Sequence, residues 1–324
     1  MKNKSALIVT SIAAADNAVL KALASGCRER DVLFIVIGDE SSSPVFQLAG
    51  CRFYDLAAQS KRGFRFAKKC PTRHYARKNV GYLLAMREGV SRLLETDDDN
   101  FPELGFWEER PRRPAVKFIP KAGWINVYRY FTDARIWPRG LPLDCPIQQG
   151  LANENPDVDA IYRLTFPLPQ SFPKEGRVAL GAGTWSPFNS QNTTWWRDAF
   201  PLLYLPAYCS FRMTDIWRSF IAQRIAWTND WAVLFHEPNV RQERNAHDLM
   251  RDFRDEVPGY LNNRRICDAL ENLSLPSGTD KIKDNLRVCY DKLIGLGVID
   301  RRKGGLLEVW IADLEEILPV PATA

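Results

Sequence analysis

Two continuous runs of apolar residues near the N-terminus predict strands that are buried on both faces. They span residues 6–12 and 32–38 and are rich in branched side chains, as in the strands of a parallel sheet. The segment between them, residues 17–25, has a helical pattern with one apolar face formed by Val19, Leu20 and Leu23. The order strand, helix, strand predicts an α/β protein that begins with an open sheet.

Polar residues follow both predicted strands, where the strands of such a sheet usually bind ligands. Thr10 closes the first strand and Asp39 follows the second, and both side chains can hydrogen-bond a base or a ribose. Because Gly-Asp is also a common turn pair, ordinary turn chemistry explains Gly38 and Asp39 equally well.

A third apolar pattern leads to a cluster of acidic residues. Residues 76–88 predict an amphipathic helix that ends at Gly89, and residues 90–94 predict a strand that delivers Asp97–Asp99. Three adjacent carboxylates repel one another, so a fold that gathers them at a strand end usually provides a cation. Mg²⁺ and Mn²⁺ prefer carboxylate oxygens and often share a phosphate as ligand. The alternative is a solvated acidic turn.

Residues 61–78 carry eight basic side chains with three aromatic residues between them. Such a strip is typical of an RNA-binding surface, and it also suits a diphosphate. We favour the diphosphate, because a metal–diphosphate complex needs both the basic strip and the acidic cluster, whereas RNA needs only the first.

The segments Ala76–Tyr82 and Leu93–Asp99, with Gly89 between them, resemble the core of a GT-A-fold glycosyltransferase. The form Glu-Thr-Asp-Asp-Asp-Asn is similar to the STELLO-like family. More distantly it resembles the reversibly glycosylated polypeptides, which are UDP-arabinopyranose mutases. The resemblance covers about residues 5–255. It implies a GT-A-like, Rossmann-like open mixed sheet flanked by helices.

The resemblance also implies roles for individual residues. Asp99 is expected to ligate Mn²⁺ or Mg²⁺, and Asp97 to contact the metal, the ribose or the donor sugar. Asp98 lies between them and is expected to help bind the donor, with no more specific role. The remaining donor-binding candidates are, near the base, Thr10 and Asp39, and, near the diphosphate or sugar, Arg73, Arg77 and Asn79.

Two further candidates come from the second half of the chain. Asp215 belongs to an Asp-x-Trp segment that faces the acceptor in the mutase-like family, which implies a general base; a helix cap is the alternative. GT-A enzymes often supply a third metal ligand from a histidine, and His236 is the best-placed candidate; an ordinary core or surface histidine is the alternative.

Other patterns in this half are less specific. Asp157 and Asp159 repeat the spacing of the acidic motif, but the alternation that follows them predicts a strand across residues 157–165. Residues 183–215 mix amides with tryptophans, which suits sugar binding or a core of bulky side chains.

After residue 256 the sequence predicts helices or short elements and has no cluster of candidate catalytic residues. We expect a catalytic domain over residues 1–256 and a small, mainly helical C-terminal appendage over residues 257–324, which serves packing or formation of a homo-oligomer.

Composition narrows the remaining choices. The chain has 324 residues and a net charge of +5, too mildly basic to indicate nucleic acid by itself. Seven widely spaced cysteines without a CxxC pair indicate reduced thiols in the cytoplasm. No apolar run approaches the ~20 residues of a transmembrane helix.

The resemblance, together with the acidic and basic patterns, implies a metal-dependent glycosyltransferase that transfers sugar from a nucleotide sugar, most simply a UDP-sugar, to a carbohydrate or other hydroxyl acceptor. The alternatives are a UDP-sugar mutase-like or self-glycosylating protein, and a non-catalytic scaffold of the same fold.

Overall fold

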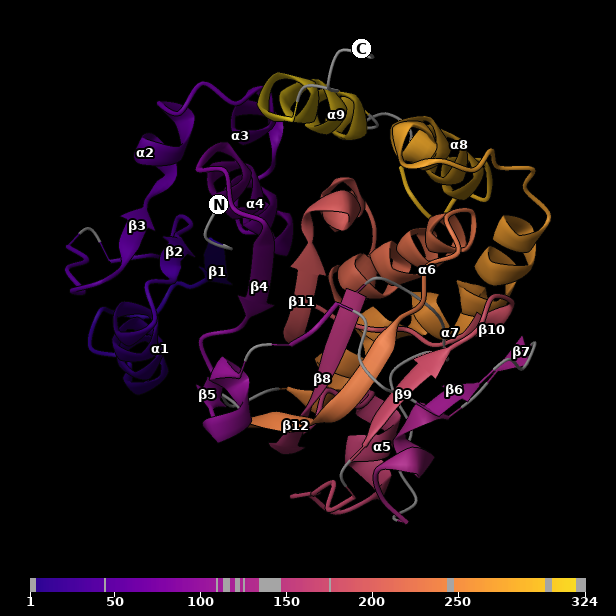
Figure 1. Cartoon of the computed structure of the whole chain (residues 1–324), viewed down its shortest axis with the longest axis horizontal. Helices are drawn as coiled ribbons and strands as arrows, with labels where there is room; N and C mark the ends of the chain where they lie inside the picture. Colours follow the sequence, from indigo (N-terminus) through magenta and orange to yellow (C-terminus); the bar gives the residue numbers. More distant parts are fainter. Residues whose placement is uncertain are drawn as a thin grey trace.

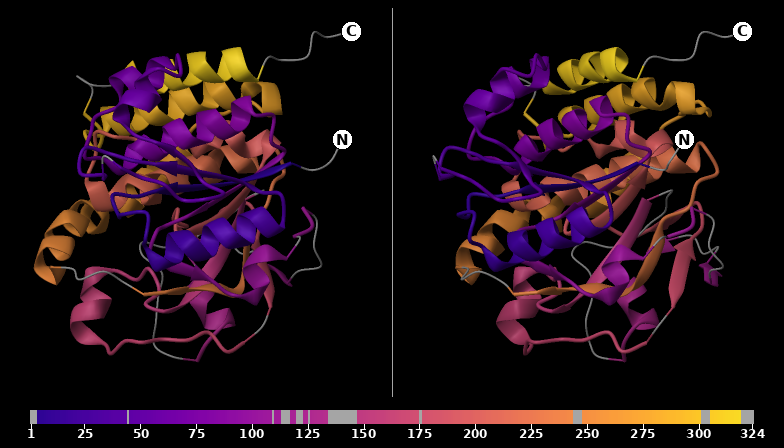
Figure 2. Two further views of the ribbon diagram at one scale, coloured as in Figure 1. Left: turned by 90° about the vertical axis from the view of Figure 1, so that its left-hand side faces the viewer. Right: turned by 60° about the vertical axis from the view of Figure 1, so that its left-hand side comes forward.

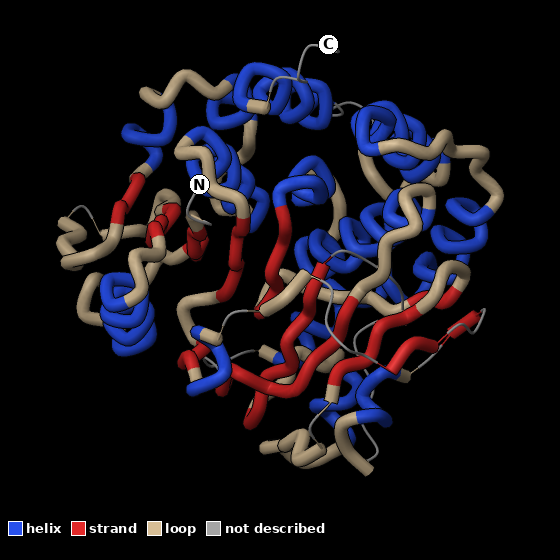
Figure 3. Tube along the Cα trace, viewed as in Figure 1, coloured by secondary structure: helices blue, strands red, loops and turns tan. Residues whose placement is uncertain are grey.

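The computed structural model describes residues 4–43, 45–108, 110–112, 117–119, 123–124, 126–133, 147–174, 176–243, 248–300 and 305–318. A mixed sheet crosses the molecule and is flanked by helices (Figure 1, Figure 3). Within these residues ten strands form the sheet, in the order β3-β2-β1-β4-β11-β8-β12-β9-β6, with β5 paired to β12. A separate pair joins β7 to β10.

The elements have the following bounds. The strands are β1 Ser5–Thr10, β2 Leu33–Ile37, β3 Arg52–Tyr54, β4 Arg92–Thr96, β5 Asn100–Pro102, β6 Lys117–Ile119, β7 Gly123–Trp124, β8 Ile147–Glu154, β9 Arg177–Leu180, β10 Thr184–Trp185, β11 Asn192–Trp196 and β12 Leu234–Gln242. The α-helices are α1 Ala18–Glu29, α2 Leu56–Ser60, α3 Arg65–Lys69, α4 Lys78–Arg87, α5 Ala160–Thr165, α6 Thr214–Trp227, α7 Leu249–Glu271, α8 Ile282–Gly295 and α9 Gly305–Ile317. Short 3-10 helices include η1 Tyr75–Arg77 and η5 Phe211–Met213.

The N-terminal half of the sheet is parallel, as its sequence predicts. Strands β3, β2, β1 and β4 run in the same direction. Along β1, Leu7 and Val9 join one hydrophobic cluster and Ala6 and Ile8 join another, so both faces of the strand are buried. Helix α1 contacts β2, α4 contacts β1 and β2, and helices lie on both faces of the sheet (Figure 2). The predicted fold class is therefore confirmed.

Local sequence explains where the two flanking helices lie. The side chain of Asn17 accepts a hydrogen bond from Leu20 N (2.9 Å) and so begins α1. Gly89 follows α4 with φ of +74°, a conformation that suits glycine at a helix end. Gly81 lies within α4, where an added Cβ would stand 2.6 Å from Ile8 Cγ2. Helix α4 therefore packs closely on β1, which fixes the position of its N-terminus at the sheet edge.

Strand β11 runs in the direction opposite to the parallel strands of the sheet. It is antiparallel to β4 and to β8, and Asn192 is paired with Thr96. Strand β4 extends through Thr96, two residues beyond the predicted strand end. The beginning of β11 therefore lies beside the end of β4, which brings the residues before Asn192 to the acidic motif.

The prediction of a strand across residues 157–165 is wrong. These residues form α5, and Asp159 is its N-cap, accepting a hydrogen bond from Tyr162 N (2.8 Å). The carboxylate that caps a helix stabilises that helix, and this local interaction outweighs the alternating pattern that follows it.

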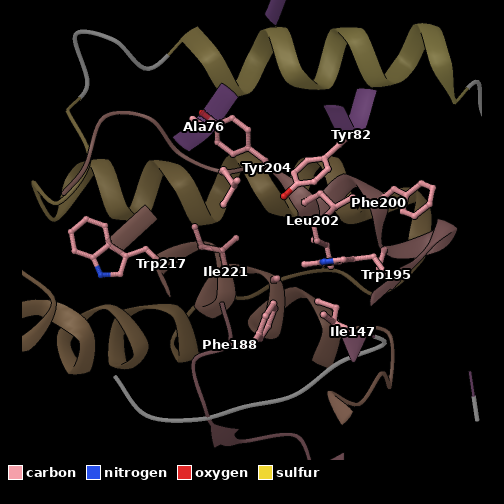
Figure 4. Close-up of a cluster of buried hydrophobic side chains, with 14 of the residues drawn as sticks. Ala76, Tyr82, Ile147, Phe188, Trp195, Phe200, Leu202, Tyr204, Trp217 and Ile221 are labelled. Carbon is pink, nitrogen blue, oxygen red and sulfur yellow. The ribbon is translucent and has the colours of Figure 1, made fainter. Parts of the chain in front are cut away.

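The C-terminal helices pack into the same hydrophobic core as the N-terminal half. Helix α7 runs across the predicted division between residues 256 and 257, and α9 contacts α3 and α4. The buried tryptophans of the polar–aromatic segment belong to this core, and Figure 4 shows Trp195 with Tyr204 and Trp217 among its side chains. None of the helices in the described part of the chain is long and apolar enough to cross a membrane.

Candidate functional site

The candidate site lies at the edge where parallel strands β1, β2 and β4 end. Strand β1 pairs with β2 on one side and with β4 on the other, so the strand order changes direction here. Open α/β sheets bind their ligands in the crevice at such a point. Ser11 follows β1 directly, and its hydroxyl donates a hydrogen bond to Asp98 Oδ2 beyond the end of β4. The middle carboxylate of the acidic motif is thus tied to the end of β1.

A buried lysine holds the first carboxylate of the motif. Lys78 is fully buried, and its Nζ donates to Asp97 Oδ1 (2.9 Å), to Thr96 O (2.9 Å) and to Ser190 O (3.2 Å). The hydroxyl of Tyr75 also donates to Asp97 Oδ1 (2.7 Å). The protein therefore neutralises part of the charge of the acidic motif itself, so the repulsion among the three carboxylates is a weaker argument for a cation than the sequence suggests.

The other two carboxylates of the motif have different surroundings. Burial raises the pKa of Asp98, the hydrogen bond from Ser11 opposes that change, and the negative charge of Asp97 adds to it. Asp99 accepts hydrogen bonds from Gln242 Nε2 (3.0 Å) and from Asn100 Nδ2 (3.2 Å). Each of the three carboxylates is half-buried, so none is sealed from a ligand.

The atoms of the acidic motif are of the kind that a hard divalent cation prefers, although its three carboxylates do not converge as a metal site among the described residues. Asp97–Asp99 provide carboxylate oxygens, and Asn100 Oδ1 is buried without a hydrogen-bond partner among the described residues. Amide and carboxylate oxygens are the ligands that Mg²⁺ and Mn²⁺ prefer.

Asp215 lies on the same hydrogen-bond network as Asp97. It is in the first turn of α6, and its Oδ2 accepts a hydrogen bond from Ser190 N (3.1 Å). The Ser190 hydroxyl lies 3.1 Å from Asp215 Oδ2 and 2.8 Å from Tyr75 Oη, which in turn donates to Asp97. The N-cap of α6, Met213, makes no side-chain cap hydrogen bond. Two predicted site residues that are 118 positions apart are therefore linked through only two side chains, Ser190 and Tyr75.

Two residues assigned to the diphosphate are structural instead. Arg77 is buried, and its guanidinium donates to Gln59 Oε1 (3.0 Å), Ala67 O (3.0 Å) and Cys70 O (2.9 Å). Asn79 is fully buried, donates to Leu205 O and accepts from Leu205 N, each at 2.9 Å. Because these groups are occupied inside the protein, the structure does not support their predicted contact with a donor.

Arg77→Met should lower the free energy of unfolding by about 3 kcal/mol, because three buried acceptors lose a charged donor. Its affinity for a nucleotide should match that of the wild-type protein at a temperature where both are folded. Chemical denaturation measures the first quantity and calorimetric titration the second. Arg264→Met is the matched control, since that side chain is 85% exposed and its removal should cost about 1 kcal/mol at most. A loss of nucleotide affinity in the folded Arg77→Met protein would show that Arg77 contributes to nucleotide binding.

The residues that we expect to bind the nucleotide away from the acidic motif lie at the same edge of the sheet. Asp39 follows β2, and its Oδ2 accepts a hydrogen bond from His74 N (3.2 Å), which joins this strand end to the start of α4. Thr10 ends β1 and is half-buried. The side chain of Arg73 is 78% exposed and forms an ion pair with Glu40 (2.6 Å). Their contacts with a nucleotide stay a prediction.

The structure does not bring His236 to the acidic motif. His236 lies on β12, where it pairs with Gly150 of β8 and Arg177 of β9. Asp99 contacts Gln242, which lies six residues further along β12. At the spacing of residues in a strand, His236 and Gln242 are roughly 15–20 Å apart. Burial and then the charge of Arg110 lower the pKa of His236. Among the described residues no three His, Cys, Asp or Glu side chains gather as a metal site. His236 therefore lies apart from the acidic motif in this structure.

Sequence reasoning missed several residues that build the site. They are Tyr75, Lys78 and Ser190. Tyr75 and Lys78 are three positions apart at the beginning of a helix, a spacing that places two side chains on one face and was available from the sequence. No local pattern marks Ser190, because it reaches the site through the antiparallel pairing of β11.

The fold and the site define a Rossmann-like α/β protein with an acidic and basic cluster at the carboxyl ends of its parallel strands. Within this class, residues 212–319 match the model of the family described as STELLO glycosyltransferases. The chain is 28% identical over 269 residues to the probable glycosyltransferase STELLO2 of Arabidopsis thaliana, which covers 72% of this chain and 35% of that protein. It is also 28% identical over 248 residues to the probable glycosyltransferase STELLO1 of the same plant, covering 64% and 32%.

These matches confirm the predicted resemblance to STELLO-like glycosyltransferases. The chain spans about a third of the length of these curated relatives. A solved structure, described as that of a mycobacterial protein, aligns over 81% of this chain and 75% of its own with a TM-score of 0.45 and 9% identity. That likeness is too low to support an argument.

Proposed function

We propose that this protein is a metal-dependent glycosyltransferase that uses a nucleotide sugar, with a UDP-sugar as the donor. The observation that carries the proposal is the hydrogen-bond network from Asp97 through Tyr75 and Ser190 to Asp215. This network links a candidate donor-binding carboxylate to a candidate base through two side chains. The similarity to the STELLO glycosyltransferases supports the same reaction class.

The donor side of the proposed site consists of the acidic motif and the residues that hold it. Asp97–Asp99 and Asn100 would hold Mn²⁺ or Mg²⁺, which supplies charge stabilisation for a leaving diphosphate when it is bound. Lys78 and Tyr75 fix the position of Asp97 through the hydrogen bonds described above. Ser11 holds Asp98 against the end of β1. A rigid set of carboxylates lowers the cost of arranging the donor for reaction.

The acceptor side depends on Asp215. In the proposed step the acceptor hydroxyl attacks the anomeric carbon, its proton passes to Asp215, and a new carbon–oxygen bond forms. The bond between the anomeric carbon and the diphosphate breaks, and its electron pair leaves with UDP. Ser190 fixes Asp215 Oδ2 through its backbone N–H and its hydroxyl, which positions the carboxylate for this proton transfer.

Incubation with Mn²⁺, a panel of UDP-sugars and a panel of carbohydrate and other hydroxyl-bearing acceptors, followed by mass spectrometry of the products and of the protein, tests the proposal. Release of UDP together with a glycosylated acceptor supports it. Conversion of the donor sugar's ring form without transfer supports the mutase-like alternative, and sugar attached to the protein supports self-glycosylation. UDP-sugars that bind and stay unchanged with every acceptor in the panel support the scaffold.

Asp99→Asn should remove most of the metal-dependent affinity for UDP, because the amide lacks the charge that a divalent cation needs. Asp157→Asn is the matched control from the second acidic pair. The carboxylate of Asp157 accepts a hydrogen bond from Asn189 (2.9 Å) and forms an ion pair with Arg163 (3.8 Å), which are residues outside the acidic motif, so this variant should keep nearly full affinity. Calorimetric titration of UDP with Mn²⁺ measures both. An equal loss in two folded variants would refute the choice of Asp99 as a metal ligand.

A further inference from the structure

An aromatic side chain stands exposed beside the network. Phe211 begins η5, four residues before Asp215, and is 53% exposed. Removing apolar surface from water is favourable by roughly 25 cal/mol per Å² of buried area, so a ligand that covers this ring would gain that free energy. The exposed ring therefore offers a contact surface for a ligand in the site.

The ring of Phe211 is held by two residues that are themselves tied to the site. Its centroid lies 5.8 Å from that of His74 and 6.3 Å from that of Tyr75, with interplanar angles of 70° and 73°. In both pairs the rings meet edge to face, the arrangement that aromatic quadrupoles favour. His74 N donates to Asp39 and the Tyr75 hydroxyl donates to Asp97, so the orientation of Phe211 is coupled to both strand ends.

We propose that Phe211 stacks against the pyranose ring of the nucleotide-sugar donor and so strengthens the binding of the sugar. The proposal rests on the proposed function. Tyr75 connects Phe211 to Asp97 at the acidic motif, which would bind the diphosphate, and the donor sugar is the ring attached directly to that diphosphate. The apolar C–H face of a pyranose suits an aromatic side chain, while its hydroxyls suit the polar groups around it.

Calorimetric titrations with Mn²⁺ test this proposal, with UDP and then UDP-glucose, UDP-galactose and UDP-xylose as probes. In the wild-type protein at least one UDP-sugar should bind more tightly than UDP. Phe211→Ala should lower the affinity for that UDP-sugar by roughly five- to tenfold, while the affinity for UDP itself should change by less than about twofold. Phe211→Trp should retain the preference. Leu261→Ala removes another exposed apolar side chain (74% exposed), on α7, and should leave all affinities unchanged.

Several results would overturn the proposal. Equal weakening of UDP and UDP-sugars in Phe211→Ala would assign the ring to the nucleobase, and unchanged affinities would leave it without a role in donor binding. A wild-type protein that binds UDP but prefers no UDP-sugar would overturn the stacking alone. A wild-type protein that does not bind UDP with Mn²⁺ would overturn the proposed function as well.

Discussion

Asp215→Asn is expected to reduce kcat for sugar transfer by roughly 10²–10⁴-fold, the usual contribution of a general base. The amide keeps the size of the side chain and accepts the hydrogen bond from Ser190 N, but it cannot take the acceptor's proton. The affinity for UDP should therefore stay near that of the wild-type protein. Steady-state kinetics with the donor identified by the UDP-sugar panel give kcat, and calorimetry gives the affinity.

Ser190→Ala provides a graded comparison for Asp215→Asn. It removes one of the two donors that hold Asp215 but leaves the carboxylate, so its loss in kcat should be smaller. If Asp215→Asn retains kcat within about threefold, a general-base role is refuted, since that change is far below the contribution expected.

Glu95→Gln is expected to lower the free energy of unfolding by about 3–5 kcal/mol, the usual cost of breaking a buried ion pair. Glu95 and Arg218 are almost completely buried and lie 2.9 Å apart, and Trp195 Nε1 also donates to Glu95 (2.8 Å). The variant leaves the Arg218 charge without its partner. Chemical denaturation measures the effect. The matched control is Glu88→Gln in the exposed pair with Arg52, which should cost about 1 kcal/mol at most.

The same pair predicts a dependence on pH. Burial raises the pKa of Glu95, but the charges of Arg218 and then Lys78 outweigh burial, so its pKa in the folded protein is below its usual value of 4.5. The unfolded chain therefore binds a proton more readily, and this part of the stability is present above pH 4.5 and is lost as the pH falls through the lower folded value. The acid loss of stability should be shallower in Glu95→Gln. An equally steep loss would mean that Glu95 does not contribute to it.

The parallel half of the fold was predictable because each signal there is local. Apolar runs marked β1 and β2, Asn17 and the helical pattern marked α1, and Gly89 marked the end of α4. The position of α5 was not predicted, because one carboxylate can begin a helix or a strand and only its hydrogen bond to Tyr162 distinguishes the two.

The candidate site was predictable only in part, because side-chain direction depends on packing. Arg77 and Lys78 are adjacent basic residues in the sequence, yet Arg77 binds carbonyl groups between helices and Lys78 reaches Asp97. A difference of one position turns a helical side chain by about 100°. Asp97 and Asp215 were both named from sequence, but their connection depends on Ser190, which tertiary pairing alone brings to them.

Calorimetric titration of UDP into the wild-type protein, first with Mn²⁺ and then with EDTA, tests the central claim most directly. We expect binding with Mn²⁺ and loss of binding when EDTA removes the metal. Equal binding under both conditions would contradict the metal site at Asp97–Asp99, and the absence of binding under both would contradict the use of a UDP-sugar.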